Sequence, residues 1–257
     1  MLKLFQAELK RVWIEFTRYP LDAIAAVITI TVLFYGLFLS ARYIAGSSMQ
    51  FGTRLDAIVF GYVLWNLVIF TVNNISLGLQ TEAQIGTLEQ LFLSPYGAPM
   101  ILLARAFASL TIHLVLVVAV LLVITFFTGR QLHFSPSLIL PLITVLLGAY
   151  GISFSMGALA LLFKRVQQLL GLLGFGLLLL LAFPPESWSQ PLRFLGPVLP
   201  MIPGTVILRH IMVRNSNLDW HELAIALFNG MGYLILGLLV FWVAEKEVKR
   251  QGTLGRY

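Results

Sequence analysis

Few side chains in this sequence could carry acid–base or metal chemistry: eleven acids, four histidines and no cysteine. The lack of cysteine excludes a thiolate nucleophile and a disulfide framework. A proton or sodium relay through a membrane usually places a carboxylate near mid-depth, although this costs about 2.5–3.5 kcal/mol on insertion scales. All eleven acids fall outside the middle of the long apolar runs. The sequence therefore argues against an ion-coupled carrier, leaving only ion sites made of backbone carbonyls.

The histidines and serines form no recognisable catalytic motif. Only His113 lies in an apolar run, where we expect a neutral imidazole hydrogen-bonded to a neighbouring helix. His221-Glu222 is followed by Leu-Ala-Ile and does not complete H-E-x-x-H, and GISFSMG at 151–157 is not a G-x-S-x-G elbow. We predict no catalytic residue, metal site or bound cofactor. The weaker alternative of a membrane enzyme would have to use the polar groups near the last apolar run: His210, Asp219, His221 and Glu222.

One polar interval, TEAQIGTLEQLFLSPYG at 81–97, separates two long apolar runs. Its apolar residues recur at helical spacing and form one stripe: Leu88, Leu91 and Phe92. Glu82 and Glu89 lie on other faces of the same helix, and Ser94-Pro95 ends it. The pattern predicts a short amphipathic helix parallel to the membrane, which would suit docking of a partner protein.

Composition indicates the elements that surround this interval. Of the 257 residues, 59% are hydrophobic and 11% charged, against roughly 45–50% and about 25% in soluble domains. A helix needs about 20 apolar residues to cross a bilayer, and six runs qualify: Leu21–Ile44, Ala57–Leu79, Met100–Phe127, Leu138–Phe163, Gln168–Phe183 and Leu223–Ala244. We predict an all-α integral membrane protein with six transmembrane helices in a single domain, residues 1–257. Such unbroken apolar runs exclude a β-barrel.

Lysine and arginine set the expected orientation. With both termini in the cytoplasm, ten basic residues lie inside: Lys3, Lys10, Arg11, Arg18, Lys164, Arg165, Lys246, Lys249, Arg250 and Arg256. Six would lie outside: Arg42, Arg54, Arg130, Arg193, Arg209 and Arg214. The positive-inside rule favours this arrangement. The net charge of +6 is then explained by topology and contact with anionic lipid rather than by nucleic acid.

The first 19 residues are basic and amphipathic. Apolar residues recur at helical spacing from Leu2 to Phe16, and charged residues occupy the other faces. We predict a helix lying in the membrane interface, with Pro20 allowing a sharp turn into the first span. A plain basic topology signal is the alternative.

The segment 184–222 carries six of the eleven prolines. This density prevents one continuous spanning helix. We predict short re-entrant or interfacial helices before the last span, anchored by Trp188 and Trp220. A loop outside the membrane that folds over the protein is an equal alternative.

Two further features of the apolar runs favour packing over chemistry. Gly171, Gly174 and Gly176 lie in a span and not between a strand and a helix, so they predict close helix packing or a dimer seam instead of nucleotide binding. Arg105, a few residues into the third span, is expected to extend its guanidinium to the cytoplasmic surface.

The 81–97 interval resembles the cytoplasmic loop of ABC-2 type transporter permeases. The matching residues are Glu82, Gly86, Thr87, Leu88, Glu89, Gln90, Leu91, Ser94 and Pro95. The Pro-rich segment looks like the one that precedes the last span of that family, through Pro200, Pro203 and Arg209. The amino-terminal segment is similar to the family's interfacial connecting helix, so the resemblance covers nearly the whole chain.

This resemblance implies a half-transporter in the cytoplasmic membrane: two six-span subunits, identical or different, with two ATP-binding subunits docked at residues 80–97. No G-x-x-x-x-G-K-[ST] sequence occurs here, so ATP and Mg²⁺ would be bound by the partner chain. The few charges favour export of a hydrophobic or amphipathic molecule, drug or lipid-like. Export of polysaccharide or glycolipid is the alternative, and an assembly factor is a weaker one.

Overall fold

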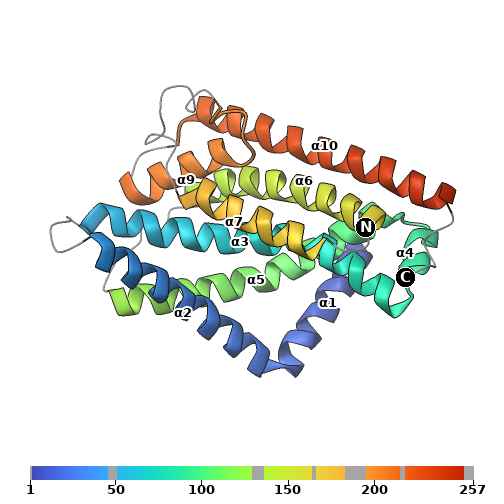
Figure 1. Cartoon of the computed structure of the whole chain (residues 1–257), viewed down its shortest axis with the longest axis horizontal. Helices are drawn as coiled ribbons and strands as arrows, with labels where there is room; N and C mark the ends of the chain where they lie inside the picture. Colours follow the sequence, from blue (N-terminus) through green and yellow to red (C-terminus); the bar gives the residue numbers. More distant parts are fainter. Residues whose placement is uncertain are drawn as a thin grey trace.

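Helix α6 (Ile139–Phe163) lies at the centre of a helical bundle (Figure 1). It packs most extensively against α10 (Trp220–Gln251) and α3 (Phe51–Ile85). The computed structural model describes residues 2–45, 51–128, 136–163, 166–182, 195–214 and 218–251, and all regular structure in these ranges is helical. The prediction of an all-α protein is confirmed.

The other elements surround these three helices. They are α1 (Leu2–Arg18), α2 (Pro20–Ala45), α4 (Leu88–Leu93), α5 (Ala98–Thr128), the 3₁₀ turn Pro136–Leu138, α7 (Gln167–Ala182) and α9 (Ile202–Arg214). Helix α4 and the last turns of α10 lie at one end of the bundle, called here the α4 end, and α9 lies at the opposite end (Figure 1).

Among the described residues, four helices are long and apolar enough to cross a bilayer: Phe60–Ile85, Ala98–Ile124, Pro136–Phe163 and Trp220–Gln251. Two more of the predicted runs correspond to α2 and α7. Helix α2 meets the same criterion only together with α1, and α7 has 16 residues, short of the ~20 that a perpendicular span needs. The chain is therefore a multi-pass membrane protein, and the count of six spans stays a prediction.

The amino-terminal helix turns sharply into the first apolar run. Helices α1 and α2 meet at 83°, and Pro20 occupies the first position of α2, where its missing N–H is not needed. The amide of Tyr19 still donates to the carbonyl of Glu15, so α1 stays helical up to the bend. The predicted turn at Pro20 is confirmed.

Glycines bring α6 and α10 into backbone contact. A Cβ added to Gly237 would lie 2.0 Å from the carbonyl oxygen of Gly151, a separation that no side chain tolerates. In α7, by contrast, only Gly174 approaches another helix, at Ile69 of α3, whereas Gly171 and Gly176 face open space. The expectation that GLLGFG packs closely inside the subunit therefore holds for one of its three glycines.

The Pro-rich segment is described from Leu195 onward, and Pro184 and Trp188 lie outside the described residues. Helix α9 has 13 residues, about 20 Å at 1.5 Å per residue, too short to cross the bilayer. It packs against α6 and α10. Asn229 of α10 donates to the carbonyls of residues 197–199, which ties the turn before α9 to the last helix.

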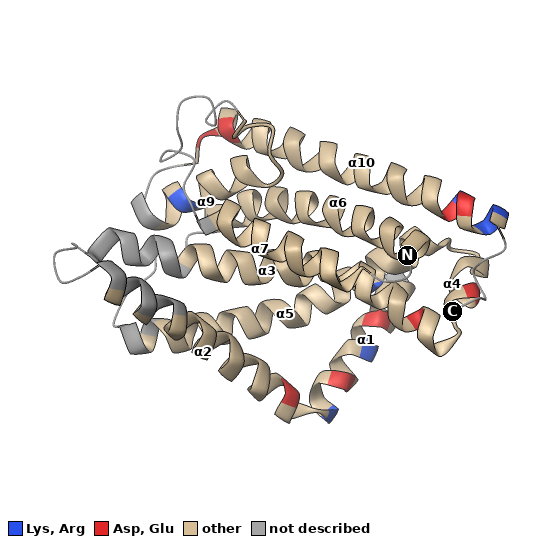
Figure 2. Ribbon diagram, in the orientation of Figure 1, with Lys and Arg blue, Asp and Glu red and all other residues tan. Residues whose placement is uncertain are grey.

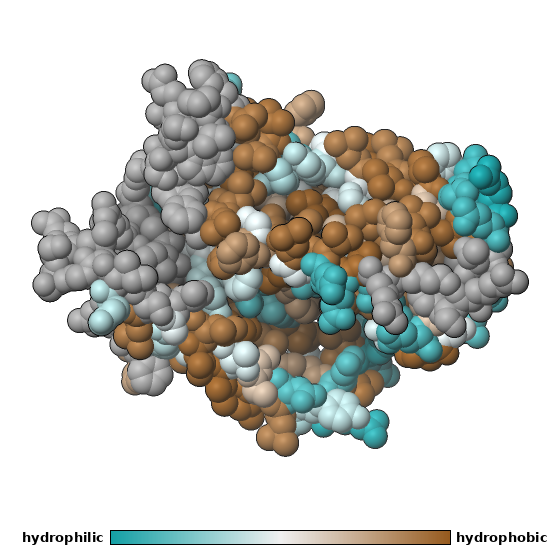
Figure 3. Space-filling model, viewed as in Figure 1, coloured by the Kyte–Doolittle hydropathy of each residue, from teal (hydrophilic) through white to brown (hydrophobic). Residues whose placement is uncertain are grey.

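Charged and hydrophobic residues are distributed unevenly along the length of the bundle. Figure 2 shows acidic and basic residues all along α1 and near the ends of α2, α3 and α10, with uncharged ribbon over the middle of α10 and of the described parts of α2 and α3. Figure 3 shows hydrophobic side chains over the middle of the visible face and hydrophilic ones over the last turns of α10. This distribution matches a protein whose middle lies in lipid.

Candidate functional site

The corner between α3 and α4 is made by Gly86. Helix α3 continues through Ile85, and Gly86 then adopts a φ of 81°, in the left-handed region that glycine reaches without strain. The amide of Thr87 donates to the carbonyl of Glu82 at 2.9 Å and closes the turn. Glu82 thus belongs to the last turns of α3. The expectation that it shares one short helix with Glu89 is wrong, because the helix-favouring residues before Gly86 extend the span.

Helix α4 is only six residues long and is held by its apolar side. Leu88, Leu91 and Phe92 are 2%, 7% and 7% exposed and belong to the main hydrophobic core. The apolar stripe predicted from the spacing of these residues is confirmed, and it packs against the helical bundle of the same chain. These three residues therefore anchor the helix and cannot be its contact surface for another protein.

The side of α4 that faces away from the bundle is mixed. Glu89 and Gln90 are exposed, and Leu93 is 81% exposed. Ser94 ends the helix with an extended backbone. The exposed Pro95 follows Ser94 and enlarges this outer surface.

The last turns of α10 support α4 from a distant part of the sequence. The ammonium of Lys249 lies 5.4 Å from the ring centroid of Phe92, and Val248 is buried in the same core as Leu91. Lys249 also pairs with Glu245 at 2.7 Å. Helix α4 is therefore fixed to the last span as well as to α3 and α5.

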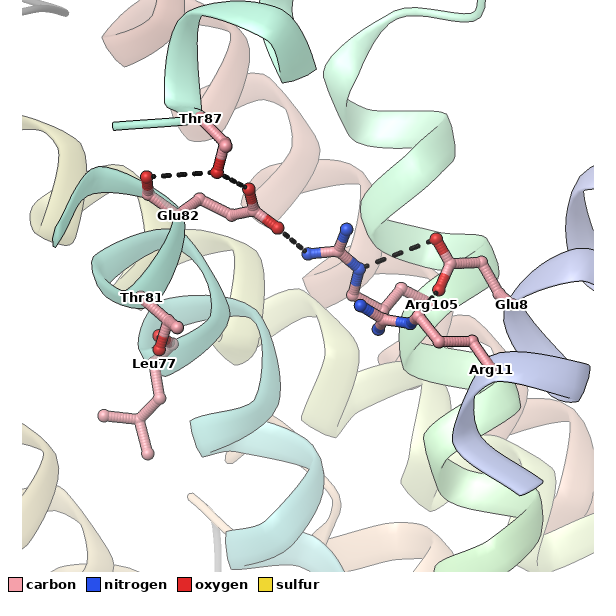
Figure 4. Close-up of polar contacts among 7 residues, drawn as sticks. All are labelled: Glu8, Arg11, Leu77, Thr81, Glu82, Thr87 and Arg105. Carbon is pink, nitrogen blue, oxygen red and sulfur yellow. Dashed lines mark hydrogen bonds and ion pairs between the residues drawn. The ribbon is translucent and has the colours of Figure 1, made fainter. Parts of the chain in front are cut away.

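A charged cluster joins three helices beside this corner (Figure 4). Arg105 of α5 donates from Nη1 to Oε1 of Glu82 at 2.6 Å, and its Nε lies 3.7 Å from Oε1 of Glu8 on α1. Glu8 also pairs with Arg11 at 3.0 Å. The hydroxyl of Thr87, at the start of α4, donates to Oε2 of Glu82. One arginine therefore links α1, α5 and the α3–α4 corner.

The cluster is poorly hydrated and balanced in charge. The side chains of Glu8, Glu82 and Arg105 are 12%, 18% and 18% exposed, and two carboxylates face two guanidinium groups. Removal of one member would leave a partner charged and largely out of water, which is costly. Arg105 was expected to extend its guanidinium to the cytoplasmic surface, but its side chain is only 18% exposed and is paired with Glu82 and Glu8.

The Pro-rich residues predicted from the resemblance lie at the opposite end of the bundle. Pro203 stands in the first turn of α9, Pro200 in the turn before it, and Arg209 donates from Nη2 to the carbonyl of Leu181 at 2.8 Å. That bond ties α9 to the end of α7. The structure therefore separates Pro200, Pro203 and Arg209 from the Glu82 cluster.

The remaining polar candidates form no catalytic group among the described residues. His113 is 7% exposed and stacks on Phe70 with ring centroids 3.7 Å apart, and its Nε2 has no hydrogen-bond partner. Asp219 accepts from the amide of His221 at 2.8 Å, a contact typical of a residue that caps a helix. Within the described ranges, no group of three or more His, Asp or Glu side chains could hold a metal ion.

Residues 3–213 match the model of the family described as ABC-2 type transporter, a range that includes α1 to α7, most of α9 and the whole Glu8–Arg105–Glu82 cluster. A search of curated proteins gives no match. Because the family match spans most of the 257 residues, the chain belongs to the ABC-2 type transporter family and is a membrane permease of an ABC transporter.

Proposed function

We propose that this chain is one of two six-span permease subunits of an ATP-driven exporter in the cytoplasmic membrane, with both termini and α4 on the cytoplasmic side. A separate ATP-binding subunit, which holds ATP and Mg²⁺, docks on the outward side of α4. The substrate is a hydrophobic or amphipathic molecule, drug or lipid-like. The observation that carries this proposal is α4 itself, which is buried on one side by the bundle and exposed on the other.

This arrangement supports transmission of force. A push on Glu89, Gln90 and Leu93 cannot be absorbed by α4 alone, because its buried side is packed into the core. The displacement passes to α3 through the Gly86 corner and to α5 through Arg105. ATP can shift the transporter from one state to the other only if it binds the two states with different affinity. In this proposal, α4 is the element through which the ATP-binding subunit transmits that shift to the permease.

The test separates the two sides of α4. Glu89→Arg changes an exposed residue, so we expect unchanged thermal stability of the purified permease, at least tenfold weaker binding of the cognate ATP-binding subunit, and loss of ATP-dependent transport. Glu222→Arg, an exposed reversal at the opposite end, is the matched control and should leave binding intact.

Leu91→Asp serves as a contrast, because it places a carboxylate in the core. We expect it to lower stability by more than about 3 kcal/mol and to lose binding only as a result of misfolding. A combined variant with Glu89→Arg and with Gln90 and Leu93 also substituted tests the whole surface. If it binds the ATP-binding subunit and transports as well as the wild-type chain, docking on this surface is ruled out.

A further inference from the structure

Three polar groups of α3 lie inside the bundle without a hydrogen-bond partner. They are Oδ1 of Asn73, Oγ of Ser76 and Nε2 of Gln80. Ser76 is fully buried, and the orphaned atoms of the other two are buried although their side chains are partly exposed. Residues spaced by three and then four share one face of a helix. These residues, called here the α3 polar strip, thus follow one another along a single side of α3.

Several other polar side chains of the spans find partners, although Oγ1 of Thr31 on α2 and Nε2 of His113 on α5 do not. The hydroxyl of Thr71, also on α3, donates to the carbonyl of Leu67 at 2.9 Å, and Ser153 of α6 donates to the carbonyl of Val72 at 3.0 Å. Tyr150 of α6 reaches the carbonyl of Ala106 on α5. The bundle therefore can satisfy hydroxyl groups at membrane depth, and the α3 polar strip differs in having three unsatisfied groups along one face of one helix.

Such a departure is costly where no bulk water is present. An unpaired polar group in the hydrocarbon region costs several kcal/mol, and each buried unsatisfied group of a native protein calls for an explanation. The strip lies within the apolar span Phe60–Ile85. Three orphaned groups in succession call for a partner that the described residues do not supply.

The face that carries the strip contacts α2 and α7 near its beginning, and farther along Ser76 is also buried. Tyr62 of this face donates to the carbonyl of Ile30 on α2 at 2.7 Å, and Ile69 contacts Gly174 of α7. Asn73, Ser76 and Gln80 continue the same face toward the α4 end. There the next charged residue, Glu82, is already held by Arg105.

We propose that the α3 polar strip binds neutral hydroxyl or amide groups of the transported molecule as it crosses the membrane. This inference rests on the proposed export function and narrows its substrate class. Asparagine and glutamine side chains offer both donors and acceptors, as serine does, which suits a ligand group that also does both. An ion is a poor ligand, because no unpaired charge of α3 is described beside the strip. A wholly apolar molecule is also a poor ligand, because it would leave all three groups without a hydrogen-bond partner.

The experiment replaces each group by an apolar side chain of similar size: Asn73→Leu, Ser76→Ala and Gln80→Met. Thr71→Val is the matched control, because that hydroxyl is already satisfied within its own helix. The probes are a fluorescently labelled alkyl glucoside and the same amphiphile with every sugar hydroxyl methylated. Two measurements are made: ATP-dependent transport in proteoliposomes with the cognate ATP-binding subunit, and the probe-induced thermal shift of the permease alone in nanodiscs.

In both measurements, we expect the wild-type chain and Thr71→Val to respond more strongly to the glucoside than to its methylated form. Each strip substitution should reduce that preference by up to about tenfold, the value of one hydrogen bond, while melting temperature without probe stays equal or rises. A rise is expected because the substitution removes an unsatisfied group. Equal response of the wild-type chain to both probes, or strip variants that melt lower with the preference unchanged, would overturn the proposal.

The two measurements also separate this inference from the proposed function. If the glucoside stabilises the permease alone and the strip variants abolish that shift, the strip binds hydroxyl groups even when no ATP-dependent transport is seen. If transport is ATP-dependent but insensitive to the strip, the export function holds and the inference fails.

Discussion

At the scale of single residues, Arg105 determines how the α4 end is held together. Sequence placed Glu82 in a polar interval and Arg105 alone in the next apolar run, 23 positions away. Their pairing depends on the register in which α3 and α5 pack, which no local pattern encodes. The stripe of Leu88, Leu91 and Phe92 was predictable from its spacing, but the same spacing fits a helix docked inward or outward.

Arg105→Ala should destabilise the purified permease by about 1.5–3 kcal/mol, the range for hydrogen bonds to charged groups. The reason is that Glu82 and Glu8 would lose their shared partner in a poorly hydrated site. Arg105→Lys, which keeps a positive charge beside both carboxylates, should recover part of the loss, as measured by thermal unfolding in nanodiscs.

Arg250→Ala is the control for this experiment. Arg250 also pairs with a glutamate, but its side chain is 78% exposed, and exposed pairs contribute about 0–1 kcal/mol. Equal effects of the two alanine substitutions would contradict a structural role for the Glu8–Arg105–Glu82 cluster.

At the scale of helices, the closest packing was not where the sequence had suggested it. The glycines of GLLGFG are close in sequence and therefore suggested close packing, yet a Cβ added to Gly171 or Gly176 would have no atom within 4 Å. A role for these two glycines at a seam between subunits stays a prediction. The glycines that matter inside the subunit, Gly151 and Gly237, are 86 positions apart. Only the parallel packing of α6 and α10 brings them together.

Gly237→Ala should therefore weaken the fold, because its methyl group would overlap the carbonyl of Gly151. We expect a loss of about 1–3 kcal/mol or more from this overpacking, measured as a lower melting temperature. Gly171→Ala places the same methyl group in open space and should be neutral or stabilising by up to about 1 kcal/mol. A melting temperature unchanged by Gly237→Ala would contradict the close contact of α6 with α10.

At the scale of the whole molecule, composition predicted the fold class and the main apolar helices correctly. The long runs of α3, α5, α6 and α10 were clear because each exceeds the width of a bilayer. Their boundaries were less clear: α3 runs on to Ile85 and α10 to Gln251, beyond the apolar residues, because charged and polar helix formers continue a helix into water.

The proposed orientation can be tested directly, since the chain has no cysteine of its own. Gln90→Cys and His221→Cys each create a single exposed thiol, at the α4 end and at the opposite end. We expect a membrane-impermeant maleimide to label His221→Cys in intact cells and Gln90→Cys only in inverted membrane vesicles. The reverse pattern would place α4 outside the cell and remove the basis for ATPase docking.

The shortness of α4 has a practical consequence for anyone who wishes to inhibit this transporter. A six-residue helix has no stability of its own in water, where isolated helices below about 12–15 residues are marginal, and its conformation is imposed by the bundle through Leu88, Leu91 and Phe92. A synthetic peptide of residues 81–97 would be mostly unfolded and a weak decoy for the ATP-binding subunit. A chemically stapled version, with the three anchoring side chains replaced by polar ones, would be the better competitor.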